Sequence, residues 1–195
     1  MHPVFSHNEF LVKEHIGMFK AASNYDVYDP ETGDQILQCR ERHLGVFTKM
    51  LRFTDYKRMT PFNLSIETLE EEPLLRVSRG ASFWRSKVAV HDDENDLLGY
   101  YRQKLMTIGG GFQVLSDQEE PMCKVKGSFT GWTFRFLIED QEVAIVSKNW
   151  SGLGKEMFTS ADTYKLTIDD SVPSDSLLRQ LILGSVFCID LVLKE

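Results

Sequence analysis

The C-terminal stretch of this sequence constrains its fold more than any other feature. Residues 181–189 read Leu-Ile-Leu-Gly-Ser-Val-Phe-Cys-Ile, so a helix here has no polar stripe on any face. A helix that is apolar all round must be enclosed by protein or by lipid. A membrane span needs about 20 apolar residues, and Arg179 and Asp190 flank this stretch closely. We therefore expect a helix over about 174–193, with Ser174 as its N-cap, buried within the rest of the chain.

Upstream of residue 170 the sequence has the pattern of short strands joined by tight turns. Alternating apolar and polar residues run into acidic or glycine-containing turns and out again, which is typical of hairpins. Hairpins are expected over 25–40, 88–102 and 134–148, and further strands at 10–14, 62–67, 74–79, 113–116, 123–127 and 164–168. About twelve strands suffice to close a sheet and remove its edges. The sequence predicts a mainly β protein, a closed antiparallel barrel of about twelve strands around the C-terminal helix, as one domain over residues 1–195.

The predicted helix also constrains where function can lie. Gly184 and Ser185 are small, so the barrel wall can approach the helix closely there. Because the helix fills the lumen, we expect no deep ligand cavity along the barrel axis. The sequence contains no G-x-S-x-G or H-E-x-x-H motif, and the glycines at 109–111 precede a strand rather than a phosphate-binding helix. These features favour surface binding over catalysis, and we expect a protein that is not an enzyme.

Charge and cysteine content limit the class of partner and the compartment. The net charge is −7, which argues against nucleic-acid binding because such surfaces are basic. Cys39, Cys123 and Cys188 form no C-x-x-C pair, so neither a disulfide framework nor a zinc site is expected. Residues 1–9 contain no apolar leader. We expect a cytoplasmic protein that does not span the membrane and that can associate with its surface.

One stretch of the sequence is basic, although the chain as a whole is acidic. It contains the candidate binding residues Arg40, Arg42, His43, Lys49, Arg52, Lys57 and Arg58. Arginine and lysine suit phosphate because they give charge-assisted hydrogen bonds. We interpret the stretch as a candidate site for a phosphate-bearing anion. A solvated strand and loop, whose charges keep an edge soluble, would have the same composition.

Three segments near the C-terminus resemble a known family. Residues 181–190 look like the closing helix of phospholipid scramblases. Residues 145–150 and 161–166 resemble both scramblases and the plant LURP-one-related proteins. These families belong to the tubby C-terminal-like group, and the resemblance implies their fold, a closed antiparallel barrel around a buried C-terminal helix.

The scramblase resemblance implies a calcium site in the segment 160–170. Its carboxylates are Asp162, Asp169 and Asp170. Calcium takes about six to eight oxygen ligands at closely spaced positions, whereas Lys165 interrupts this segment. A strand that ends in an acidic turn accounts for the same residues. Apart from calcium, no cofactor is expected.

Three functions remain open at this stage. The tubby resemblance implies that the basic stretch from Arg40 to Arg58 binds lipid headgroups. Our first expectation is therefore a non-enzymatic module that binds anionic phospholipids or phosphoinositides at a membrane surface or acts in regulation. The second is a soluble protein-interaction or stress-response scaffold, whose partner is a protein and which binds no lipid. The third is a calcium-dependent, scramblase-like activity on phospholipids.

Overall fold

The computed structural model describes residues 1–15, 22–41, 60–80, 87–103, 111–128, 132–148 and 163–193. These residues form a 3₁₀ helix, twelve strands and a C-terminal helix. In chain order the elements are η1 (Pro3–Ser6), β1 (Glu9–Glu14), β2 (Tyr25–Tyr28), β3 (Gln35–Arg40), β4 (Phe62–Glu67), β5 (Pro73–Arg79), β6 (Lys87–Asp92), β7 (Leu97–Gln103), β8 (Gly111–Ser116), β9 (Pro121–Ser128), β10 (Thr133–Ile138), β11 (Gln141–Ser147), β12 (Thr163–Ile168), α2 (Leu177–Cys188) and the π-helical turn η4 (Ile189–Leu193).

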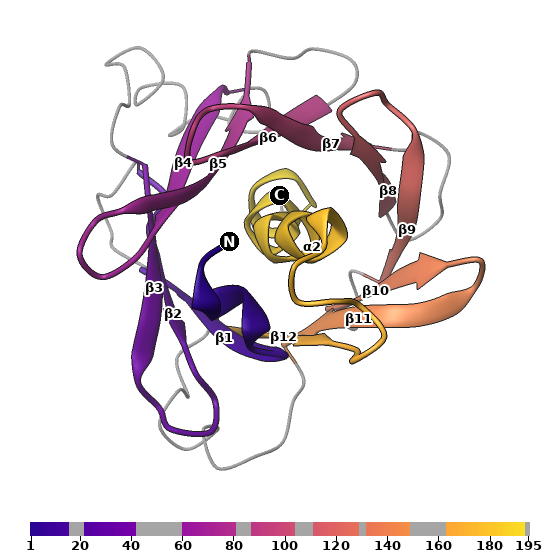
Figure 1. Ribbon diagram of the computed structural model, residues 1–195. Coiled ribbons are helices and arrows are strands. Elements are labelled where there is room, and N and C mark those ends of the chain that lie inside the picture. Colours follow the sequence, from indigo (N-terminus) through magenta and orange to yellow (C-terminus); the bar gives the residue numbers. More distant parts are fainter. Residues whose placement is uncertain are drawn as a thin grey trace.

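The strands form a closed antiparallel barrel in which almost every strand pairs with its neighbours in the sequence. The barrel closes where β1 pairs with β12, with Glu9 opposite Thr167 and Lys13 opposite Thr163. Closure leaves no free edge, and Figure 1 shows the ring of strands around the central helix. The predicted fold class is confirmed.

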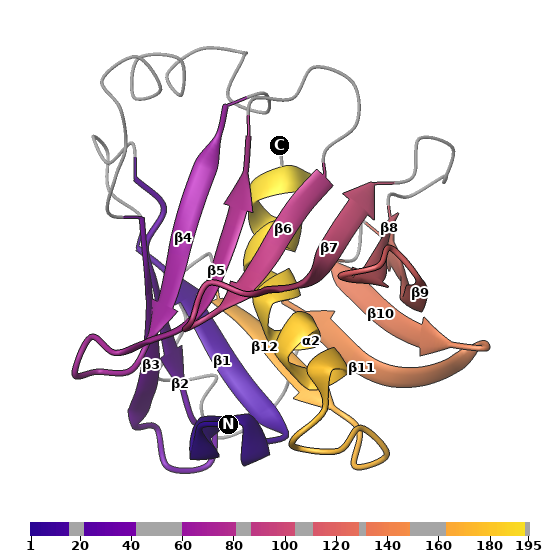
Figure 2. The ribbon, with the colours of Figure 1, turned by 45° about the horizontal axis from the view of Figure 1, so that its top comes forward.

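The C-terminal helix occupies the lumen, as the sequence predicts (Figures 1 and 2). Leu181, Ile182 and Phe187 are 0% exposed, because strands surround the helix on all sides. Burying a side chain of this size contributes about 1.5–3 kcal/mol, so this apolar stretch is a large part of the core. No helix among the described residues is long and apolar enough to cross a membrane.

The start of the helix differs from the prediction. Ser176, not Ser174, is the N-cap, and its Oγ accepts a hydrogen bond from the Arg179 backbone N–H at 3.2 Å. Ser174 lies in the preceding turn, which the Ser176 N–H closes by bonding to the Pro173 carbonyl. Both serines fit the sequence rule for an N-cap. Because the chain turns after Pro173, Ser176 rather than Ser174 lies beside the unpaired backbone N–H groups at the start of the helix.

Gly184 lies where the helix comes closest to the wall. A Cβ at this position would lie 2.7 Å from the Tyr101 Oη and 3.3 Å from the Val77 Cγ2. The Tyr101 hydroxyl donates a hydrogen bond to the Leu181 carbonyl at 2.5 Å, so it is fixed at the contact. The predicted close approach at Gly184 is confirmed. The neighbouring Ser185 is 0% exposed and donates to the Ile182 carbonyl.

The two charged residues at the ends of the helix are both buried, which sequence reasoning did not anticipate. Arg179 is 3% exposed and donates to the carbonyls of Val172 and His7 and to the Asn8 side chain. Asp190 is 4% exposed and accepts from the hydroxyls of Tyr25 and Tyr164. Burying a charge is costly unless it is hydrogen-bonded. Each charge therefore binds one end of the helix to the barrel.

The alternating strand directions divide the connections between two rims of the barrel (Figure 2). We call one end the hairpin rim, because the short turns 29–34, 68–72, 93–96, 117–120 and 139–140 lie there, together with η1 and the start of α2. We call the other end the loop rim, because there the strands lead into and out of the segments 15–24, 41–61, 80–86, 104–110, 129–132 and 148–162.

Candidate functional site

Arg40 is the only one of the seven basic candidates within the described residues, and it lies on the outer face of β3 at the loop rim. Its guanidinium is held against β2, since Nη1 donates to the Tyr25 carbonyl at 2.7 Å and Nη2 to the Asp26 Oδ1 at 2.7 Å. The side chain is 24% exposed. Nη1 also donates to the Cys39 carbonyl. An arginine has five N–H donors, so three hydrogen bonds to the described residues fix the position of Arg40 without using all of its donors.

Asp26 is the centre of a small network on this outer face. Its Oδ2 lies 2.5 Å from the His15 Nε2 and accepts from the Tyr28 hydroxyl at 3.5 Å. Partial burial acts to raise the pKa of the Asp26 carboxyl, but the hydrogen bonds from Arg40 and His15 outweigh it and hold the pKa below its usual value. Asp26 therefore offsets part of the Arg40 charge.

The other six basic candidates lie outside the described residues, namely Arg42, His43, Lys49, Arg52, Lys57 and Arg58. The strands on either side of them lie within the described residues. β3 ends at Arg40 and β4 begins at Phe62, both at the loop rim, and the two strands pair with Arg40 opposite Ser65. The stretch is thus attached to the loop rim at both of its ends.

Of the three calcium candidates, one lies outside the described residues and two lie within them. Asp162 lies outside the described residues. The Asp169 Oδ1 accepts a hydrogen bond from the Ser171 N–H. Hydrogen bonding from the Ser171 side chain, and then from its backbone, lowers the pKa of Asp169. The Asp170 Oδ1 accepts from the Asn8 side chain at 2.5 Å. Both carboxylates stabilise the turn after β12, and the described part of the chain contains no group of three or more histidine, cysteine, aspartate or glutamate side chains placed to hold a metal ion.

The sequences of the segments that connect strands at the two rims differ sharply in charge. The five hairpin turns contain fourteen carboxylates and no lysine or arginine: Asp29, Glu31, Asp34, Glu70, Glu71, Glu72, Asp93, Glu94, Asp96, Asp117, Glu119, Glu120, Glu139 and Asp140. The six segments that connect strands at the loop rim contain ten lysines and arginines against four carboxylates. Summed charges of this kind orient a protein in an external field. The barrel order brings the acidic turns to one rim, which the linear sequence does not display.

The three cysteines give no sign of a nucleophile. Cys39, Cys123 and Cys188 are all buried and free. Burial raises the pKa of Cys123 and of Cys188 to about 12, and it raises that of Cys39 as well. Because only the thiolate is nucleophilic, these side chains act as small apolar residues of the core.

The fold defines the class of protein first. A closed antiparallel barrel around a buried, apolar C-terminal helix is the architecture implied by the resemblance to scramblases and the tubby-like group. A comparison with family models then matches the Scramblase family over residues 5–195, and the chain belongs to that family. Comparisons with curated proteins and with solved structures find no significant match.

Proposed function

We propose that this chain is a non-enzymatic scramblase-family module that binds anionic phospholipid headgroups at a membrane surface through its loop rim. The observation that carries the proposal is the charge polarity of the barrel. The hairpin turns hold fourteen carboxylates, whereas the connections at the loop rim are predominantly basic. An anionic surface attracts one rim and repels the other, so the charge pattern selects a single orientation.

The stretch from Arg40 to Arg58 supplies the largest share of the basic charge. Near an anionic bilayer each lysine or arginine contributes about 1 kcal/mol of attraction. The stretch contains six such residues, and His43 beside them. Arg40 is oriented by Asp26 and by the Tyr25 carbonyl, so it adds a fixed donor at the edge of the rim. Binding of this kind weakens with added salt, because screening shortens the reach of surface charges.

A binding role also fits the interior of the barrel. The helix fills the lumen with side chains such as Leu181 and Phe187, and the thiols of the described residues are held in their neutral form by burial. The outer surface and the rims are what remains for recognition. Membership of the Scramblase family supports a phospholipid as the ligand.

The test is co-sedimentation of the purified chain with vesicles of phosphatidylcholine alone, with added phosphatidylserine, and with added phosphoinositide. We expect binding only to the anionic vesicles, and loss of binding as salt rises from about 50 to 500 mM. The charge-reversal variant Arg42→Glu/Lys49→Glu/Arg52→Glu should lose binding. Arg40 stays in place in this variant, because a carboxylate there would lie against Asp26 and destabilise the barrel.

The matched control reverses charge on the wall between the rims. Lys126 and Arg135 face each other across β9 and β10, and their side chains are 62% and 61% exposed. Lys126→Glu/Arg135→Glu should bind anionic vesicles nearly as well as the unmodified chain. Equal binding by the rim variant, or binding to neutral vesicles, would contradict the proposal. A strict calcium requirement would favour the scramblase-like activity, and no binding at all would favour a protein-interaction scaffold.

A further inference from the structure

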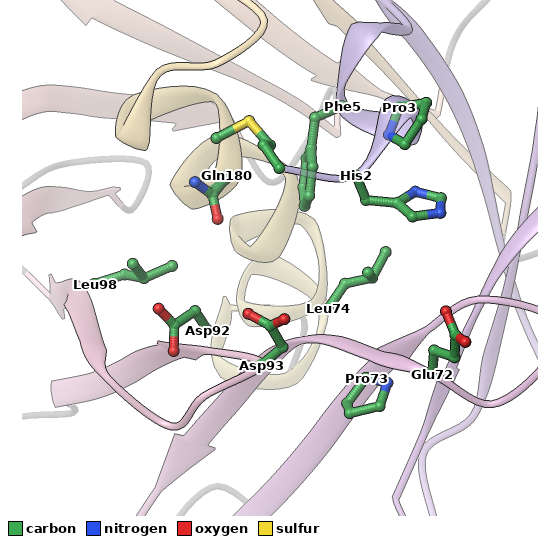
Figure 3. Close-up of a pocket in the computed structure, with 11 residues that line it drawn as sticks. His2, Pro3, Phe5, Glu72, Pro73, Leu74, Asp92, Asp93, Leu98 and Gln180 are labelled. Atoms are coloured by element: carbon green, nitrogen blue, oxygen red, sulfur yellow. The ribbon is translucent and has the colours of Figure 1, made fainter.

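A pocket of about 780 Å³ opens at the hairpin rim beside the first turns of α2 (Figure 3). Pockets that bind small molecules commonly measure about 300–1,000 Å³. Four separated parts of the chain form it: η1 with the residues before it, the start of β5, the β6–β7 hairpin, and α2 through Gln180. The pocket lies at the opposite end of the barrel from the loop rim, so it is independent of the proposed membrane contact.

One part of the lining is apolar. Phe5 is 4% exposed and extends from η1 toward the cavity, and Leu74 and Leu98 come from the two walls below it (Figure 3). Leu74 and Leu98 are partly buried against the main core. η1 is held in place because the His2 Nδ1 accepts a hydrogen bond from the Val4 N–H. The pocket therefore has a preformed apolar surface that can exclude water from a ligand.

A second part of the lining is acidic. Asp92 and Asp93 come from the β6–β7 hairpin, and Glu72 comes from the turn before β5. The Asp92 Oδ1 accepts a hydrogen bond from the Asp96 N–H at 2.7 Å, which orients this carboxylate. Within the described part of the chain, none of the three carboxylates forms an ion pair, and no lysine or arginine lines the pocket. Met1 also lines the pocket, and its α-ammonium group offsets one of these charges, so the site has a surplus of about two negative charges beside an apolar surface.

We propose that this pocket binds an organic cation, specifically a primary ammonium group attached to an apolar body. An ammonium group has three N–H donors, which match several carboxylate oxygens, and charge-assisted hydrogen bonds are the strongest polar contacts available. The apolar body would lie against Phe5, Leu74 and Leu98. The positive end of the helix dipole opposes a cation with about half a unit charge, which is less than the charge of the carboxylates.

The test compares phenethylamine with 2-phenylethanol, which has the same ring and chain and no charge. Titration calorimetry on the full chain at neutral pH should show binding of the amine and at least about tenfold weaker binding of the alcohol. Amide chemical shifts should change at 92–98 and 177–181 and stay constant on the strands at the loop rim.

The decisive variant is Asp92→Asn/Asp93→Asn, since asparagine keeps an oxygen to accept the Asp96 N–H bond. It should lower the affinity for phenethylamine about tenfold and leave that for the alcohol unchanged. The control Asp117→Asn/Glu120→Gln removes two charges from the β8–β9 turn, which does not line the pocket, and should bind as the unmodified chain does. Equal affinity for amine and alcohol, equal losses in both variants, or no binding of the amine would each overturn the proposal. None of these outcomes depends on vesicle binding.

Discussion

Gly184→Ala should destabilise the barrel, although alanine is the better helix former. The added Cβ would lie 2.7 Å from the Tyr101 Oη and 3.3 Å from the Val77 Cγ2. Forcing a group into a packed core costs about 1–3 kcal/mol. If the Tyr101 hydroxyl moves away, it loses its bond to the Leu181 carbonyl, and leaving such a group unsatisfied costs about 1–3 kcal/mol. Against this, alanine gains about 1 kcal/mol of helix propensity. Together these terms predict a net loss of about 1–5 kcal/mol in the free energy of unfolding.

The assay is urea unfolding of four proteins: the unmodified chain, Gly184→Ala, Tyr101→Phe and the double variant. Removing the Tyr101 hydroxyl removes the nearest contact, so Gly184→Ala should cost about 1–2 kcal/mol less in the Tyr101→Phe background. Gly80→Ala is the control, because nothing lies within 4 Å of a Cβ at Gly80. Additive effects of the two substitutions, or a Gly184→Ala variant more stable than the unmodified chain, would refute the close contact between helix and wall.

Two further predictions concern groups whose pKa the fold shifts. The native protein should leave Cys39, Cys123 and Cys188 unmodified by a thiol reagent at pH 8 and expose all three in urea, because burial raises their pKa values; rapid native labelling would contradict the buried positions. The folded state lowers the pKa of Asp26, so the stability it contributes is present above its unfolded pKa of about 4 and is lost as pH falls through the lower folded value. Asp26→Asn should therefore be less stable than the unmodified chain at pH 6, and the difference should shrink progressively as pH falls below about 4. A pH-independent difference would rule out the ion pair as the cause.

Much of the fold could be predicted from the sequence, because its signals are local. Alternation and acidic turns located the hairpins, and the all-round apolar stretch at 181–189 required enclosure. The N-cap was placed two residues early, since Ser174 and Ser176 satisfy the same rule and only the turn at Pro173 separates them. In the sequence, Arg179 and Asp190 mark the two ends of the apolar stretch. In the structure both side chains are themselves buried, and both are hydrogen-bonded to distant parts of the chain.

The functional surfaces depend on contacts that no local pattern contains. The acidic turns were visible in the sequence, but their common rim follows only from the up-and-down order of the barrel. The pocket joins Phe5, Leu74, Asp92 and Gln180, which come from four separate segments. The basic stretch was recognised by its charge, yet the partner that orients Arg40, Asp26, comes from a different strand. Charge composition was predictable, and its placement was not.

The most direct test of the central claim measures which rim meets the bilayer. A fluorophore on Gly80→Cys reports on the loop rim, where Gly80 is exposed and open, and one on Leu69→Cys reports on the hairpin rim, where Leu69 is 48% exposed. The native cysteines are buried, so labelling is selective. With anionic vesicles that carry a spin-labelled lipid, we expect quenching at position 80 and none at position 69. Quenching at position 69 alone, or equally at both, would contradict binding through the loop rim.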